Sequence, residues 1–193
     1  MKDYLKSNYY FWNDYHSKEW CQRVINYIDT LELTDATVVN WEDDDIKEVK
    51  PEIRVTKCKL IELNREENDY ERMLILEMWR LIVYANVYYN FNIDHETVTI
   101  QLGKYTEQEN SFYKPHQDDS QLFKTDGRKI SMSTILQNSE EGGAFKLDGG
   151  CQDFNGEVGS TIAFPSFFLH EVTPVTRGNR YSIVTWVSGP PWA

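Results

Sequence analysis

His116 and Asp118 lie two positions apart in segment 111–119, and both side chains can bind a divalent metal ion. In an extended strand, side chains two residues apart point to the same face, so the imidazole and the carboxylate can converge on one point. Two imidazoles and one carboxylate on one face of an octahedron form the facial triad that holds non-haem Fe(II). The pair therefore predicts two of three ligands, and the third must be a distant histidine.

His170 is the candidate for the third ligand, because it ends the apolar run 162–170. Arg180 follows ten residues later, in a segment of strand-like composition. A facial triad leaves three iron positions open, of which a 2-oxo acid can take two and O₂ the third. The guanidinium of Arg180 can pair with the far carboxylate of the 2-oxo acid, and the Ser182 hydroxyl, on the same strand face, can bond it too.

Two stretches of helical periodicity precede these residues. Ser17 is a suitable N-cap, and the apolar residues after it recur at helical spacing, which predicts a helix over 18–31. A longer periodic run predicts a second helix over 68–88, with acidic residues near its positive end. We expect both helices to brace one face of a sheet.

After Asn90 the segments become short and rich in strand-forming residues. Gly, Asn and Asp clusters separate them, and this spacing is typical of a sandwich or jelly-roll barrel. The predicted strands are 97–102, 129–136, 142–147, 160–164 and 180–187, with one or two more after Pro51. We expect one domain over 1–193, in which 1–92 is a mainly helical support region and 95–188 is the β-rich catalytic part.

The chain carries 20 Lys and Arg against 31 Asp and Glu, a formal net charge of −11. Contact with nucleic-acid phosphates or with an anionic membrane depends on Lys and Arg, so this charge disfavours both partners. It is compatible with a basic peptide or a small molecule. No apolar run approaches the ~20 residues of a membrane span, and the first residues lack the features of a signal peptide. We therefore expect a cytoplasmic protein with no nucleic-acid and no membrane partner.

Two further features have plain structural interpretations. The three cysteines, at 21, 58 and 151, are far apart and form no CxxC pair, so reduced and buried thiols are expected. The acidic run 41–45 lacks the ligand spacing and the central glycine of an EF-hand loop, so a solvated loop is expected there.

The order of the motifs resembles that of Fe(II)- and 2-oxoglutarate-dependent dioxygenases of the prolyl 4-hydroxylase type. It is most similar to the bacterial and phage group called PKHD-type hydroxylases, and the similarity covers about 95–188. The motifs that carry it are His116-Gln117-Asp118, Gly142-Gly143, Phe164-Pro165-Ser166 before His170, and the Pro174-Val175-Thr176 turn that leads through Gly178 to Arg180 and Ser182.

This resemblance implies a mainly β fold with added helices: a double-stranded β-helix of the jelly-roll or cupin-like kind, with the N-terminal helices on its major sheet. It implies His116, Asp118 and His170 as catalytic metal ligands, and Arg180 as the residue that binds 2-oxoglutarate. By similar placement, Tyr105 would donate to the cosubstrate and Tyr113 would line the pocket near the iron. In related halogenases a small residue replaces the carboxylate ligand, so the presence of Asp118 favours hydroxylation.

The implied activity is hydroxylation of an unactivated C–H bond. It would require Fe(II) and consume 2-oxoglutarate and O₂, with ascorbate as a candidate reductant. Succinate and CO₂ would be the co-products, and the resemblance points to a prolyl residue of a peptide or protein as the substrate. A free amino acid or other small molecule remains an alternative, as does a peptide-binding barrel without catalysis. Trp186 is either a substrate-facing aromatic or part of the core. A nucleobase demethylase is disfavoured by the charge of −11.

Overall fold

The structure is a computed structural model that describes residues 9–39, 47–119, 127–148, 152–154 and 156–191. The acidic run 41–45 and Cys151, for which expectations were stated above, lie outside these residues. Cys21 and Cys58 are buried and free, as expected. No helix in the described ranges is long and apolar enough to cross a membrane.

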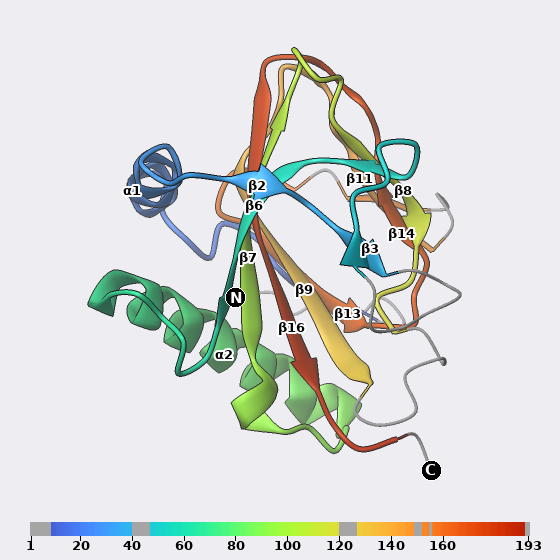
Figure 1. Cartoon of the computed structure of the whole chain (residues 1–193). Coiled ribbons are helices and arrows are strands. Elements are labelled where there is room, and N and C mark those ends of the chain that lie inside the picture. The colour runs from blue at the N-terminus through green and yellow to red at the C-terminus, as the bar shows by residue number, and fades with distance from the viewer. Residues whose placement is uncertain (1–8, 40–46, 120–126, 149–151, 155, 192–193) are drawn as a thin grey trace.

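Two antiparallel sheets form the body of the fold (Figure 1). The larger has seven strands in the order β1-β13-β9-β16-β7-β6-β2, and the smaller has five in the order β12-β11-β14-β8-β5. The bounds in the larger sheet are β1 (Tyr10–Trp12), β2 (Thr34–Asp35), β6 (Lys57–Glu62), β7 (Thr99–Thr106), β9 (Arg128–Gln137), β13 (Thr161–Pro165) and β16 (Asn179–Ser188). Those in the smaller are β5 (Arg54–Val55), β8 (Phe112–His116), β11 (Phe145–Leu147), β12 (Gln152–Phe154) and β14 (His170–Val172).

Two short strand pairs and one 3-10 turn complete the described elements. The pairs are β3 (Val38–Val39) with β4 (Lys47–Glu48), and β10 (Glu141–Gly142) with β15 (Val175–Arg177). The turn is η1 (His95–Thr97). It starts two residues before the predicted strand 97–102, which begins instead at Thr99 and continues to Thr106.

Both helices lie on the side of the larger sheet that faces away from β8 and β14 (Figure 1). Helix α1 (Lys18–Ile28) begins where the Ser17 side chain accepts a hydrogen bond from the Trp20 amide, so the predicted cap is correct. It ends three residues before the predicted position. Helix α2 (Asp69–Tyr89) begins after Asn68, whose side chain accepts from the Glu71 amide. The buried faces of α1 and α2 contribute to one apolar core against the outer face of the sheet.

A second, smaller core fills the space between the two sheets. It contains Tyr105, Phe145, Leu147, Ile162, Phe164, Val172 and Val175. These residues come from both sheets and from β15, so their packing fixes the distance at which β16 faces β8 and β14. The candidate site lies in this inter-sheet space.

The predicted strand 142–147 is in fact two strands, β10 and β11. Gly142 and Gly143 have φ of +73° and +65°, a conformation that glycine adopts readily and that ends a β-strand. A Cβ on Gly142 would also lie 2.0 Å from the Pro174 carbonyl oxygen. This pair of glycines therefore turns the chain between the two short strands.

Candidate metal centre

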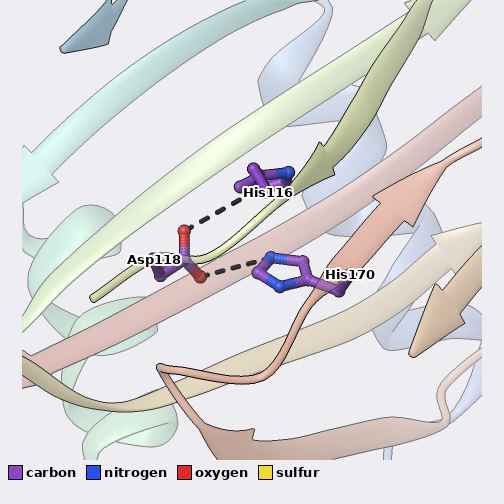
Figure 2. Close-up of side chains that lie close together, drawn as sticks. All are labelled: His116, Asp118 and His170. Atoms are coloured by element: carbon purple, nitrogen blue, oxygen red, sulfur yellow. Dashed lines mark ion pairs between the residues drawn. The ribbon is translucent and has the colours of Figure 1, made fainter. Parts of the chain in front are cut away.

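His116, Asp118 and His170 present three possible ligand atoms within 4.8 Å of one another (Figure 2). His116 ends β8 and His170 begins β14, and the two residues are direct partners in the antiparallel pairing of those strands. The pairing brings together two histidines that are 54 positions apart in the sequence. Their ring centroids lie 4.1 Å apart.

Asp118 lies two residues beyond the end of β8, which stops at His116. The two side chains still converge, as their spacing of two residues predicted. A chain segment from the neighbouring sheet holds it there. The amides of Asp118 and Asp119 both donate to the Ser166 carbonyl, at 2.9 Å and 3.0 Å. The Ser131 hydroxyl lies 2.7 Å from Asp118 Oδ2 and 2.9 Å from the Ser166 hydroxyl. Ser131 therefore fixes the orientation of the carboxylate.

Backbone carbonyls orient the two imidazoles. His116 Nδ1 lies 2.9 Å from the Lys114 carbonyl oxygen, and His170 Nδ1 lies 2.9 Å from that of Phe168. A carbonyl can only accept, so each Nδ1 carries a proton, and Nε2 is the ring nitrogen that a neutral imidazole offers to a metal ion. The two Nε2 atoms face Asp118, with His116 Nε2 3.8 Å from Oδ1 and His170 Nε2 3.4 Å from Oδ2.

The protonation states also suit a metal ion. Burial, with the adjacent His170, lowers the pKa of His116 to about 3, so its imidazole is neutral near pH 7. Burial by itself would raise the pKa of Asp118, but the neighbouring His170 and Arg128 hold it well below its ordinary value. Two imidazoles and one carboxylate, all aimed at one point, are the donor set that suits Fe(II). The residues present therefore fit the ion that the resemblance implies.

The triad opens onto a pocket between the sheets that is also lined by Arg180. Alternate residues of β16 line this pocket: Arg180, Ser182, Val184 and Trp186. Tyr105, the partner of Arg180 on β7, lines it as well, and the guanidinium lies 5.5 Å from the centre of the Tyr105 ring. The interior volume of this pocket is ≈ 30 Å³.

Arg180 is 2% exposed, and its burial lowers the pKa of the guanidinium without removing the charge. No ion pair to Arg180 occurs within the described part of the chain. A buried cation without a carboxylate partner is costly, and a bound anion would remove that cost. The arrangement can therefore bind a carboxylate in the same pocket as a divalent metal ion.

Tyr113 and Trp186 line the pocket on the metal side. The Tyr113 ring stacks on His116 with centroids 3.5 Å apart, and burial raises the pKa of its hydroxyl to about 12. Trp186 is 7% exposed, and its buried indole nitrogen has no hydrogen-bond partner among the described residues. All eight residues singled out from the sequence therefore line one pocket.

Several residues of the site were missed from the sequence. Gln101 and Ser133 line the pocket, and Ser131 bonds the carboxylate. The sequence could have indicated these three residues, because each is a polar residue within a largely buried strand. Arg54 gave no such signal, since it comes from a two-residue strand in the N-terminal half.

Residues 100–188 match the model of the 2OG-Fe(II) oxygenase superfamily. A PKHD-type hydroxylase from Synechococcus sp. (strain JA-2-3B'a(2-13)) is 39% identical over 85 residues, which are 39% of this chain and 37% of the relative. A PKHD-type hydroxylase from Idiomarina loihiensis is 29% identical over 102 residues, which are 48% of this chain and 43% of the relative. The chain spans less than half the length of these curated relatives.

Solved structures match over nearly the whole chain at low sequence identity. A prolyl-4-hydroxylase from Pseudomonas putida gives a TM-score of 0.71 at 17% identity, over 96% of this chain and 95% of that one. A prolyl hydroxylase from Trichoplax adhaerens, in complex with a hypoxia inducible factor peptide fragment, gives 0.67 at 18%, over 94% and 84%. The predicted fold class and the resemblance stated from the sequence are confirmed.

Proposed function

We propose, from the membership of residues 100–188 in the 2OG-Fe(II) oxygenase superfamily, that this chain is an Fe(II)- and 2-oxoglutarate-dependent hydroxylase. The observation that carries the proposal is the shared pocket: His116, Asp118 and His170 open onto the same buried space as Arg180. A site that only bound peptides would not need a metal triad and a separate buried guanidinium. We also propose that 1–193 acts as one domain.

The chain's own residues bind and orient the reactants. His116, Asp118 and His170 would hold Fe(II), which supplies the capacity to activate O₂ when a 2-oxo acid is bound beside it. Arg180 would pair with the far carboxylate of 2-oxoglutarate, with help from the Ser182 and Tyr105 hydroxyl groups in the same lining. Phe145, Phe164 and Trp186 exclude water from the reacting atoms.

The overall reaction divides the two oxygen atoms of O₂ between the alcohol and succinate. A substrate C–H bond, 2-oxoglutarate and O₂ give the alcohol, succinate and CO₂. One oxygen atom enters the alcohol and the other enters the new succinate carboxylate, while the C1–C2 bond of the 2-oxo acid breaks. Ascorbate, expected from the resemblance as a reductant, stays a prediction.

The substrate we propose is a prolyl residue of a peptide or protein. The support is similarity: relatives of the sequence are named PKHD-type hydroxylases, and a structural neighbour is a prolyl hydroxylase in complex with a peptide fragment. A free amino acid or other small molecule is the alternative. Tyr113 and Trp186 line the same pocket as the triad, and we propose that they contact the substrate.

Mass spectrometry of a proline-containing peptide library tests this proposal. The library is incubated aerobically with the protein, Fe(II) and 2-oxoglutarate, and succinate is followed in parallel. We expect a gain of one oxygen on one residue type, in step with succinate. Succinate formed with no oxidised peptide would reject the peptide substrate, and no iron-dependent binding of 2-oxoglutarate would reject the enzyme class.

A further inference from the structure

Arg54 is a second buried guanidinium in the pocket, and the function proposed above gives it no role. The residue is 7% exposed and lines the same space as the triad. Its Nη2 donates to the Gln101 side-chain oxygen at 2.9 Å, while its buried Nε has no hydrogen-bond partner among the described residues. Across those residues Arg54 also forms no ion pair. A buried cation left in this state favours binding of an anion.

Arg54 lies close to the metal centre through a stack of aromatic rings. Its guanidinium carbon is 4.4 Å from the centre of the Tyr113 ring, and that ring is 3.5 Å from the centre of His116. The guanidinium is therefore within roughly 8 Å of the His116 imidazole. An anion bound there would lie next to the atoms that react.

Arg54 and Arg180 occupy different levels of the pocket. Gln101, which holds Arg54, pairs with Val184 on β16, four residues beyond Arg180. The Cα positions of Arg180 and Val184 are roughly 13 Å apart along the strand at about 3.3 Å per residue. The side-chain amide of Gln101 leans back towards Gly103, the partner of Ser182, so Arg54 is held at a level between these two positions. A 2-oxo diacid that chelates the metal at one end and reaches Arg180 at the other has no carboxylate left for Arg54.

The charges of the pocket lead to the same conclusion. Its lining contains two guanidinium groups, Arg54 and Arg180, and one carboxylate, Asp118. A divalent metal ion and doubly charged 2-oxoglutarate cancel each other, so the loaded pocket keeps one excess positive charge. Arg128, at the edge, lies 3.5 Å from Asp118 Oδ1 and faces Asp119 as well, so its charge is partly compensated. The uncompensated charge belongs to Arg54.

We propose that Arg54 binds the α-carboxylate of the residue that is hydroxylated. The substrate is then either a free amino acid or the C-terminal residue of a peptide, because an internal residue has an amide in that position. The inference rests on the proposed function and narrows its substrate class. The carboxylate would accept side-on from Nε and one Nη, the bidentate geometry that guanidinium favours.

Matched pairs of acids and amides test the proposal. The full chain is saturated with Fe(II) and 2-oxoglutarate without oxygen and titrated by calorimetry with L-proline against L-prolinamide. Ala-Ala-Pro with a free C-terminus is compared with its C-terminal amide, and other free amino acids are compared with their amides. We expect the acid of at least one pair to bind at least about tenfold more tightly than the amide. The pair that shows this preference distinguishes a free amino acid from a peptide terminus.

The variants assign the preference to Arg54. Arg54→Met should bind acid and amide with affinities within about threefold of each other. Arg54→Lys should keep an intermediate preference for the acid, because lysine retains the positive charge but cannot donate two parallel hydrogen bonds. Arg65→Met, which removes an exposed guanidinium paired with Glu62, should bind as the wild type does. If Arg54→Met does not fold, Arg54→Lys and Arg54→Gln carry the comparison.

Two results would overturn the inference while leaving the proposed function intact. One is equal binding of acid and amide, or no binding of any pair, by wild-type protein that still binds 2-oxoglutarate with Fe(II). The other is an unchanged acid preference in every Arg54 variant. Failure of the wild type to bind 2-oxoglutarate would instead reject the proposed function itself.

Discussion

The three candidate ligands owe their arrangement to ordinary hydrogen bonds around them. Carbonyl oxygens hold the Nδ1 atoms of His116 and His170, and Ser131 holds the carboxylate of Asp118. The sequence predicted the ligands because they form a local motif and a distant one in a known order. It did not predict Arg54, because nothing in a two-residue strand indicates which pocket it will reach.

Ser131→Ala should weaken metal binding by about 10- to 100-fold, because the carboxylate loses the bond that orients it. Titration with Mn(II) measures this without any turnover. Ser133→Ala is the matched control, since Ser133 lies two residues along the same strand and has no hydrogen bond to Asp118. Equal metal affinity in the wild type and Ser131→Ala would show that the carboxylate needs no such support.

Arg180→Lys should lower the affinity for 2-oxoglutarate by at least about tenfold and leave metal binding unchanged. Lysine keeps the positive charge but cannot offer two parallel donors to a carboxylate. The measurement is a 2-oxoglutarate titration at saturating Fe(II) without oxygen. Unchanged affinity would mean that another group holds the cosubstrate.

At the scale of elements, periodicity predicted both helices and most strands, and glycine conformation explains the main error. The helix over 68–88 was predicted almost to its ends, because Asn68 caps it and its apolar positions repeat throughout. The strand 142–147 was wrong, because Gly142 and Gly143 bend the chain. The pairing of β8 with β14 could not be predicted, since it joins segments far apart in the sequence.

Asn68→Ala should lower the free energy of unfolding by about 1 kcal/mol, because the first turn of α2 loses its cap. Asn68→Ser should retain most of the stability, since a serine hydroxyl can accept from the same amide. Urea denaturation of the three proteins at one pH gives the comparison. A loss no larger in Asn68→Ala than in Asn68→Ser would contradict the capping role.

His16, before α1, should make the protein less stable in mild acid. The ring stacks on Trp20 and is buried, and this burial, together with Arg80, lowers its pKa to about 4. The unfolded chain, with a histidine pKa near 6.5, then binds more protons than the folded one between those values, so stability falls as the pH falls from about 6.5 towards 4. At pH 5 the loss relative to pH 8 is about 2 kcal/mol.

The His16 contribution is separated from that of the carboxylates by a variant. His16→Phe keeps a ring against Trp20 and removes the titration. Urea denaturation at pH 8 and pH 5 should show a smaller loss of stability in His16→Phe than in the wild type. An equal loss in both proteins would mean that folding does not lower the pKa of His16.

At the scale of the whole molecule, ligand binding should stabilise the fold, because the site joins the two sheets through His116, His170 and Arg180. At concentrations near 100 times the dissociation constant, a ligand adds about 2.7 kcal/mol. For a chain of this size we therefore expect Fe(II) with 2-oxoglutarate to raise Tm by roughly 5–10 °C. Thermal unfolding of Asp118→Ala under the same conditions should show no such rise.

The fold class was the feature of the whole molecule that the sequence predicted most easily. The strand-rich second half led to a mainly β fold, which the structure has, while the expectation from the charge of −11 that the protein binds no polyanion stays a prediction. In the first half, the strands predicted after Pro51 are present as β5 and β6, but their pairing with β8 and β7 was not predicted. Strand β1 was not predicted, and it too pairs with a later strand, β13. Of these strands, β5 brings Arg54 to the pocket, where we propose that it selects a substrate with a free carboxylate.

We propose that one pocket binds a metal ion and 2-oxoglutarate together. Calorimetric titration of 2-oxoglutarate without oxygen, with and without Fe(II), tests it most directly in wild type and His170→Ala. We expect one molecule of 2-oxoglutarate per chain, bound only when Fe(II) is present and His170 is intact. Binding that is independent of Fe(II), or no binding at all, would contradict the claim.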